Sequence, residues 1–289
     1  MESVRAYAKL NLTLEVVRPR DDGYHEIASV IQTVGIYDTL TFEPADGLSL
    51  ECKDPDLESD DNLVLKAARL LVEHSDSGKG ARISLEKDIP VSAGLGGGSS
   101  DAAVTLLSLN RLWGLELSLE RLTELGASLG SDVPFFLHGG TAMLHGRGEK
   151  VRTLPPADID WFVVVTPKFQ VPLKTAAAYR AISTANLTSG ALTRKLEARI
   201  RGGGDVPPQF LFNVFDAIAF ALYPGLETYW ETMHSLGARE VHLAGSGPSI
   251  FAPVAKKETG MALELLLRHR HGWNARLTPA WRSPEAVRN

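Results

Sequence analysis

The chain has 289 residues, of which 44% are hydrophobic and 22% charged, and its formal net charge is -5 at pH 7. This length accommodates one large domain or two ordinary ones with full hydrophobic cores, and the composition is that of a soluble globular protein. The negative net charge argues against a broad nucleic-acid-binding surface, and no apolar run approaches the length of a membrane span.

The single cysteine, Cys52, excludes a disulfide within the chain and is typical of a reducing compartment. The first fifteen residues alternate polar and apolar side chains, without the basic and then apolar pattern of a secretion signal. We therefore expect a cytoplasmic protein with no membrane and no nucleic-acid partner.

The first predicted element is a strand from Val4 to Val16, in which every even-numbered residue is apolar. Lys9 and Asn11 occupy the opposite face, two positions apart and therefore about 7 Å from each other. Both side chains can reach one ligand.

The next elements are marked by turn and cap signals. A turn is predicted at residues 21–23, Asp-Asp-Gly, followed by strands from His25 to Val34 and from Asp38 to Glu43. Asp61 is the predicted cap of a helix whose apolar residues recur at helical spacing over residues 64–71.

Residues 90–103 read PVSAGLGGGSSDAA and are the most informative segment. They follow a predicted strand, Ala81 to Lys87, and open a helix that ends at Gly114. Glycines let the backbone bring its N-H groups close to ligand oxygens, and a helix N-terminus adds unpaired N-H groups and a partial positive charge. Strand, glycine loop and helix in this order predict a phosphate site rather than a flexible linker.

Two common phosphate-binding loops do not match this segment. A Walker loop has a lysine directly after its glycines, and none follows here. The spacing G-x-G-x-x-G requires a glycine where this chain has Ser99.

The second half mixes strands and helices without strict alternation, so the predicted class is α+β. A helix ends between Gly126 and Gly130, and a short one begins at residues 131–134, Ser-Asp-Val-Pro. A loop at residues 154–156 marks the predicted boundary between domains 1–155 and 156–289.

The second domain is predicted to begin with a buried strand, Trp161 to Val165, and to contain a polar, glycine-rich surface stretch through residues 202–204. Its other predicted elements are helices over residues 174–182, 212–222, 226–236 and 257–268, strands over 240–243, 249–254 and near 275, and a turn at 245–247.

Three segments together resemble the three motifs of the GHMP kinase superfamily: AKLNL at residues 8–12, the glycine segment, and AGSGPSIF at 244–251. DGYHE at 22–26 and SDVPFF at 131–136 are similar to the members that act on 4-diphosphocytidyl-2-C-methyl-D-erythritol. The resemblance implies a two-domain GHMP kinase fold with the ligands between the domains. Its N-terminal domain would be like domain 2 of ribosomal protein S5, and its C-terminal domain would be ferredoxin-like.

The activity implied by the resemblance is ATP-dependent phosphorylation of the 2-hydroxyl of that substrate, in the methylerythritol phosphate route to isoprenoid precursors. The family's catalytic pair falls on Lys9 and Asp132, with Asp132 as the base and Lys9 as its electrostatic partner. Taken alone, a lysine on a polar strand face is usually solvated, and an aspartate at a helix start is usually a cap. We expect Asp132 to be cap and base together.

The resemblance places ATP on the glycine loop and Mg²⁺ on a serine hydroxyl, Ser99 or Ser100, with Ser100 as the predicted metal ligand. Asn62 falls where family members contact the nucleotide, although a polar residue of a helix's first turn explains it almost as well. The predicted loop contacts are Pro90, Val91, Ser92, Ala93, Gly94, Leu95, Gly96, Gly97, Gly98, Ser99 and Ser100.

For the cytidine end of the substrate, Tyr24 offers a stacking ring and His25 a hydrogen-bonding group. Tyr179 matches a second aromatic residue of the family that would complete a sandwich around the base, although a lone tyrosine on a helix is more often core. Three further substrate contacts are predicted, at Asn11, Gly245 and Ser246.

Two departures from the family pattern are visible. Tyr7 stands where the family usually has a proline, and the segment before Tyr179 reads PLKTAAAY, with Leu173, Lys174 and Thr175 in place of the more usual serine-threonine pair. Neither departure removes a chemical group that the mechanism needs.

Two other functions remain open from the sequence. The first is a GHMP kinase for homoserine, mevalonate or a sugar, none of which carries a cytosine for Tyr24 and His25 to bind. The second is a nucleotide-sensing regulator without catalysis, which would be expected to have lost the lysine, the aspartate or the loop serines. A monomer and a homodimer are both compatible with the sequence.

Overall fold

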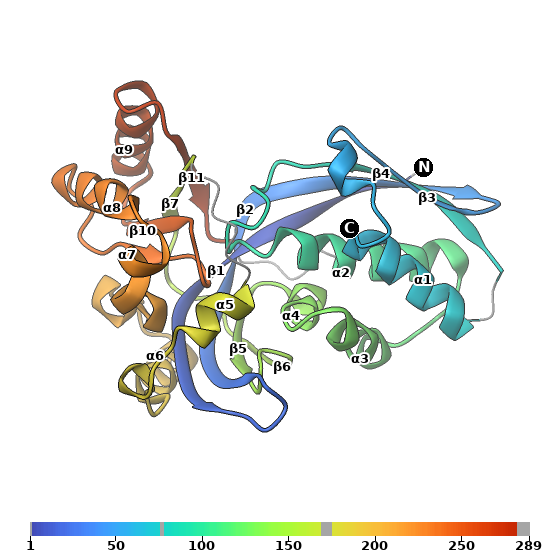
Figure 1. Cartoon of the computed structure of the whole chain (residues 1–289), viewed down its shortest axis with the longest axis horizontal. Coiled ribbons are helices and arrows are strands. Elements are labelled where there is room, and N and C mark those ends of the chain that lie inside the picture. Colours follow the sequence, from blue (N-terminus) through green and yellow to red (C-terminus); the bar gives the residue numbers. More distant parts are fainter. Residues whose placement is uncertain (1, 76–77, 169–174, 282–289) are drawn as a thin grey trace.

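The computed structural model describes residues 2–75, 78–168 and 175–281, which form two lobes connected by the long strands β1 (Glu2–Pro19) and β2 (His25–Ala45) (Figure 1). These strands pair as an antiparallel hairpin, closed by a turn at residues 20–24. The alternation predicted for β1 is confirmed, because its even-numbered residues from 4 to 16 are buried. Its odd-numbered residues from 7 to 15 are buried too, so β1 is enclosed on both faces.

The first sheet has the strand order β3, β4, β2, β1, β8, and β5 and β6 extend it beside β2. Helices α1 to α4 cover one face of it (Figure 1). The strand bounds are β3 Leu48–Cys52, β4 Gly80–Glu86, β5 Thr141–His145, β6 Lys150–Leu154 and β8 Phe212–Asn213. The helix bounds are α1 Leu63–Ser75, α2 Gly97–Trp113, α3 Leu119–Leu129 and α4 Val133–His138.

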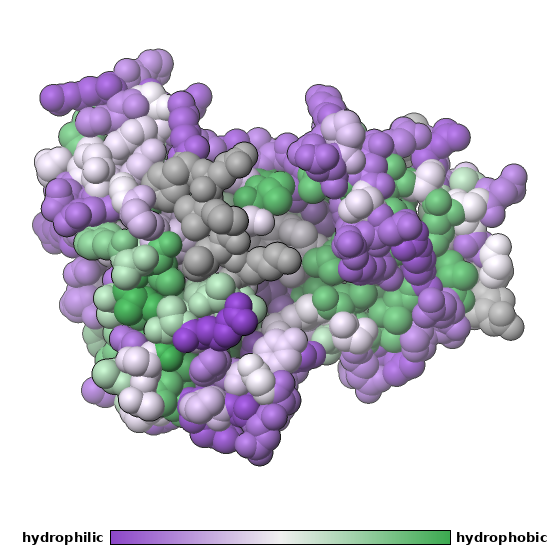
Figure 2. Space-filling model, in the orientation of Figure 1, coloured by the Kyte–Doolittle hydropathy of each residue, from purple (hydrophilic) through white to green (hydrophobic). Residues whose placement is uncertain are grey.

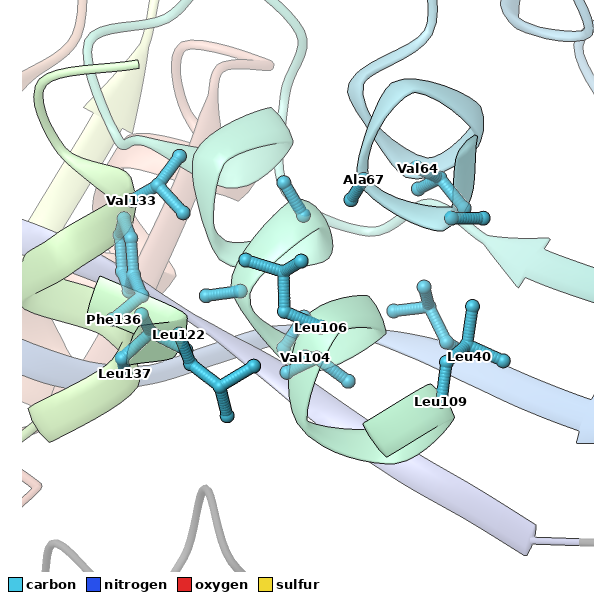
Figure 3. Packing of buried hydrophobic residues seen from close by; sticks show 14 of the residues in the cluster. Leu40, Val64, Ala67, Val104, Leu106, Leu109, Leu122, Val133, Phe136 and Leu137 are labelled. Carbon is cyan, nitrogen blue, oxygen red and sulfur yellow. The ribbon is translucent and has the colours of Figure 1, made fainter. Parts of the chain in front are cut away.

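Helix α2 lies at the centre of this lobe's core. Its apolar side chains pack against Val64 and Ala67 of α1 and against Val133 and Phe136 of α4 (Figure 3). Each large side chain buried in this way stabilises the fold by about 1.5–3 kcal/mol. This packing fixes where α2 begins, and therefore where the glycine loop lies.

The second sheet has the order β11, β7, β10, β9, with antiparallel neighbours throughout. Numbered along the chain this is 4-1-3-2, the ferredoxin-like arrangement that was expected. The strands are β7 Trp161–Thr166, β9 His242–Leu243, β10 Ile250–Val254 and β11 Asn274–Pro279. The helices are α5 Thr175–Arg180, α6 Ala191–Arg201, α7 Ala219–Leu222, α8 Leu226–Ser235 and α9 Lys257–His269. Short 3-10 helices are η1 Pro55–Leu57, η2 Thr184–Asn186, η3 Pro208–Phe210 and η4 Val214–Ile218.

The two lobes share part of their packing. Leu10 and Leu12 of β1 belong to the same buried cluster as Phe162 of β7 and Phe251 of β10. Strand β8, which comes late in the chain, pairs in parallel with β1. The boundary predicted at residue 155 remains a prediction, and both a strand and a hydrophobic cluster cross it.

Several predicted elements differ from the observed ones. The two strands predicted over residues 25–34 and 38–43 are one strand, β2, because Gly35 and Ile36 stay extended and form a bulge opposite β1. The glycine-rich surface stretch follows helix α6, in which Leu196 and Ile200 are the buried apolar residues of a sequence rich in charged side chains. Residues 212–222 form β8, η4 and α7 rather than one helix.

The cap predicted for α1 was also wrong. The Asn62 side chain accepts a hydrogen bond from the Val64 N-H group at 2.9 Å, whereas Asp61 pairs with Lys66 at 2.8 Å. The helix predicted from Lys174 is described from Thr175 onward, and Leu173 and Lys174 lie outside the described residues.

Figure 2 shows polar residues around the edge of this face of the molecule, with patches of apolar residues nearer its centre. None of the helices in the described ranges is both long and apolar enough to span a bilayer.

Candidate functional site

Lys9 is the most enclosed charged group of the predicted site, with 4% of its surface exposed. Its Nζ donates a hydrogen bond to Asn11 Oδ1 at 2.8 Å and lies 3.7 Å from Asp132 Oδ2. Asn11 Nδ2 in turn donates to Ser29 Oγ at 2.8 Å. The strand β1 and this chain of hydrogen bonds therefore hold the ammonium group in one place, beside the carboxylate.

Asp132 lies directly before α4, and its side chain makes no capping hydrogen bond. The prediction that it is a cap was therefore wrong, for two physical reasons. Its backbone is helical (φ -85°, ψ -16°) rather than extended as in a typical N-cap, and Pro134 in the first turn has no N-H to donate. The carboxylate is free to face Lys9, and 35% of it is exposed.

The glycine loop takes left-handed backbone angles at three places: Ser92 (φ 55°), Gly94 (φ 81°) and Gly96 (φ 76°). Helix α2 begins directly afterwards, at Gly97, and no side chain caps it. The N-H groups of its first turn have no carbonyl partners within the helix, so an anion can accept hydrogen bonds from them. The loop has the backbone geometry of a phosphate site.

The three sequence motifs meet at this loop. The Lys9 N-H group donates to the Leu95 carbonyl at 3.0 Å, which ties the loop to β1. The Ser249 N-H group donates to the Ala93 carbonyl at 3.3 Å, which ties it to the turn before β10. Segments that are far apart in the sequence therefore form one site.

Two side chains hold the turn at residues 244–247 through hydrogen bonds to its backbone carbonyls. Asn213 Nδ2 donates to the Leu243 carbonyl at 2.8 Å and to the Gly245 carbonyl at 2.7 Å, and the Tyr223 hydroxyl donates to the Ser246 carbonyl. A Cβ at Gly245 would lie 2.9 Å from Lys9 Nζ. A larger residue there would displace the ammonium group and would also be strained, because Gly245 has a φ of +56°.

Gly94 offers a direct test of the contact between the loop and this turn. A Cβ at Gly94 would lie 1.9 Å from the Ala244 carbonyl oxygen, and its φ is +81°. We expect Gly94→Ala to lower the free energy of unfolding by at least about 2 kcal/mol, measured by urea denaturation. Gly23→Ala is the matched control, because Gly23 has the same φ of +81° but nothing within 4 Å of its Cβ position. If Gly94→Ala lowers the free energy of unfolding no more than Gly23→Ala does, the loop does not pack against the Ala244 carbonyl as the structure shows.

Two of the residues predicted for the cytidine end come together. The rings of His25 and Tyr179 lie 5.6 Å apart, and Tyr179 also packs edge-on against Phe215 at 4.9 Å. Burial and the nearby charge of Asp132 raise the pKa of Tyr179, so its hydroxyl stays neutral. Tyr24 lies apart from this pair, on the hairpin turn, with half of its surface exposed.

Arg147, in the turn between β5 and β6, was not predicted. Its guanidinium group lies over the Tyr24 ring at 4.9 Å and donates to the Ala127 carbonyl at 2.9 Å. No spacing in the sequence connects residue 147 with residue 24, because the pairing of β5 with β2 brings the two turns together. The same holds for Ser29, Asn213 and Tyr223, which support the site from distant parts of the chain.

The remaining predicted nucleotide residues differ in accessibility. Both polar atoms of Asn62 are used within the chain, since Nδ2 donates to the Leu57 carbonyl at 2.7 Å and Oδ1 caps α1. Ser100 is 1% exposed, whereas Ser99 is half-buried and its hydroxyl oxygen is 3.7 Å from the Cβ position of Gly130. Ser99 therefore has the more open hydroxyl, while Ser100 as the metal ligand remains a prediction.

Comparisons with known proteins identify the family of the chain. The family described as GHMP kinases N terminal domain matches residues 62–140, and that described as GHMP kinases C terminal matches residues 208–277. A 4-diphosphocytidyl-2-C-methyl-D-erythritol kinase of Dehalococcoides mccartyi is 44% identical over 89% of this chain and 90% of its own. The enzyme of the same name from Symbiobacterium thermophilum is 40% identical over 94% of this chain and 98% of its own. The chain belongs to this family of GHMP kinases.

A solved structure supports the assignment. The crystal structure of a 4-(cytidine 5'-diphospho)-2C-methyl-D-erythritol kinase superimposes with a TM-score of 0.82 at 34% identity, covering 97% of this chain and all of the other. The predicted two-domain GHMP kinase fold is confirmed. As a GHMP kinase, the protein is an ATP-dependent kinase of a small molecule.

Proposed function

We propose that this GHMP kinase transfers the γ-phosphoryl group of ATP to the 2-hydroxyl of 4-diphosphocytidyl-2-C-methyl-D-erythritol, in the methylerythritol phosphate route to isoprenoid precursors. One observation carries the proposal: the Lys9 and Asp132 pair lies beside the glycine loop and the uncapped N-terminus of α2. It does so in a chain 40–44% identical to kinases named for this substrate. The paired rings of His25 and Tyr179 supply a place for the cytosine.

In this proposal the phosphates of ATP bind the N-H groups of the loop and of the first turn of α2. The substrate's 2-hydroxyl oxygen attacks the γ-phosphorus, its proton passes to Asp132, and ADP leaves. Phosphoryl transfer needs mainly positioning and charge stabilisation. Lys9 faces Asp132 and the developing negative charge, and Asn11 orients Lys9 through its 2.8 Å hydrogen bond.

ATP enters this reaction as its magnesium complex. Among the residues that the structure describes, no three His, Cys, Asp or Glu side chains gather to hold a metal. Magnesium bound through nucleotide phosphates needs only one or two oxygens from the protein, because water and phosphate fill its other positions. The Ser99 or Ser100 hydroxyl would supply such an oxygen.

The assay that tests this function offers the purified protein four acceptors with MgATP: the cytidylyl substrate, homoserine, mevalonate and a sugar. We expect ADP release and a new phosphomonoester, seen by ³¹P NMR, with the cytidylyl substrate alone. The proposal would be contradicted if that substrate were not turned over, or if another alcohol were turned over equally well.

Tyr179 tests the cytidine end separately. We expect Tyr179→Ala to raise KM for the cytidylyl substrate about tenfold or more, since stacking a base on an aromatic ring is worth about 1–3 kcal/mol. KM for ATP stays unchanged because the two ligands bind at different ends of the site. Tyr179→Phe keeps the ring and is the control, expected within about twofold of the wild type. If the Ala and Phe variants behave alike in steady-state kinetics, Tyr179 does not hold the base.

A further inference from the structure

Three charged side chains meet beside the glycine loop, and the proposed chemistry uses none of them. We name them the Lys87 cluster: Asp38 of β2, Lys87 at the end of β4, and Asp101 in the first turns of α2. Lys87 Nζ donates to Asp101 Oδ2 at 2.8 Å and also to Asp38 Oδ2. Asp38 is completely buried and Asp101 is 3% exposed.

The Lys87 cluster connects both ends of the glycine loop to one strand. Asp38 Oδ1 accepts hydrogen bonds from the N-H groups of Asp88 (2.6 Å) and Ile89 (2.8 Å), the two residues that enter the loop. Lys87 extends the connection to Asp101, which follows the loop in α2. The entry and the exit of the loop are therefore fixed relative to the same carboxylate.

The cluster lies against the end of α2 that faces the loop. A Cβ at Gly97, the first residue of α2, would lie 3.1 Å from Lys87 Nζ. Asp101 Oδ1 is buried without a hydrogen-bond partner. Burial raises the pKa of Asp101 to about 7, with Lys87 opposing the increase and Asp38 adding to it. A buried group of two carboxyls and one ammonium contributes little to the free energy of unfolding, because apolar side chains of similar size in its place often stabilise a fold equally well or better.

We propose that Lys87 and Asp101 are positioning residues of the nucleotide site, whose hydrogen bond sets the shape of the glycine loop and so its affinity for the phosphates of ATP. The inference rests on the proposed placement of ATP on that loop. Neither side chain contacts the hydroxyl that is phosphorylated. Their loss therefore raises KM for ATP and leaves KM for the acceptor unchanged.

The test uses the full chain and a fluorescent ATP analogue. We expect Lys87→Met and Asp101→Ala each to weaken binding of the analogue, and to raise KM for ATP, by about tenfold, as misplaced binding groups do. Asp101→Asn keeps an oxygen that accepts from Lys87 and is expected within about threefold of the wild type. Asp101→Ala leaves Lys87 paired with Asp38, so it folds even if Lys87→Met does not.

Lys79→Met is the matched control. Lys79 lies just before β4 and donates to the Trp113 carbonyl at the end of α2, so it connects the same two elements at the end away from the loop. We expect Lys79→Met to leave ATP binding unchanged.

Two results would overturn the proposal. One is unchanged ATP affinity in Asp101→Ala, and the other is an equal loss of affinity for ATP and for cytidine diphosphate, which indicates general destabilisation. The binding measurement does not depend on the acceptor alcohol. A wild-type protein that binds the analogue but does not phosphorylate the cytidylyl substrate contradicts the proposed function and still allows this test.

Discussion

Asp132→Asn lowers kcat by about 10³-fold, within the range expected when a positioned general base is removed. Asparagine keeps the shape of the side chain but cannot take the proton of the attacking hydroxyl, and it removes the charge that faces Lys9 at 3.7 Å. The affinity for ATP stays within about threefold of the wild type, because the loop that would bind the phosphates does not involve this side chain. Steady-state kinetics and titration with an ATP analogue check both expectations.

The structure separates this effect from a loss of stability. Because the Asp132 side chain does not cap α4, Asp132→Asn leaves the melting temperature within a few degrees of the wild type. Asp61→Asn is the matched control, since Asp61 also precedes a helix but pairs with Lys66 rather than with Lys9. A kcat within tenfold of the wild type would exclude Asp132 as the base. A wild-type protein that binds ATP and transfers no phosphoryl group would be the regulator considered at the outset.

The parts of the site that sequence reasoning placed correctly are those with a local signal. A period of two put Lys9 and Asn11 on one face of β1, and the structure joins them at 2.8 Å. The run of glycines between a strand and a helix indicated the loop, and Gly94 and Gly96 have the left-handed angles that only glycine adopts freely. Local backbone preferences and strand alternation are sufficient to predict such features.

The parts that were missed depend on contacts between distant segments. Asn213 holds the turn at residues 244–247, but nothing around residue 213 indicates this, because β8 must first pair with β1. Arg147 reaches Tyr24 only after β5 has paired with β2. Helix α6 was missed for a related reason, since Leu196 and Ile200 are too few apolar residues to mark a helix until the core they enter is known.

The structure corrects the predicted environment of Asp132, while its role as the base remains a prediction. The position before a helix led us to expect a cap, yet the helical backbone at Asp132 and the proline that follows leave its carboxylate free. In a cap, the carboxylate oxygens would accept hydrogen bonds from backbone N-H groups of α4 instead. Its freedom, together with 35% exposure, is what the proposed role as a base requires.

Lys9→Met tests the other half of the pair. We expect kcat to fall by about 10²- to 10³-fold, as when one preorganised group that stabilises transition-state charge is lost. Lys9→Arg should not restore the rate, because Lys9 is buried with its Nζ bonded to Asn11 Oδ1 at 2.8 Å, and a larger, planar guanidinium group cannot occupy the same point. Rates are measured well below the melting temperature of each variant, with saturating MgATP.

Methionine at position 9 also leaves Asn11 Oδ1 buried without its donor, at a cost of about 1–3 kcal/mol in the free energy of unfolding. Ser29→Ala is the matched control for that cost. It breaks the same chain of hydrogen bonds one step further along, at the 2.8 Å bond from Asn11 Nδ2, and leaves the ammonium group in place. We expect it to destabilise the fold by a similar amount while lowering kcat less than about tenfold. If both variants lose the same activity, the contribution of Lys9 is to the stability of the site rather than to the charge at the reacting phosphate.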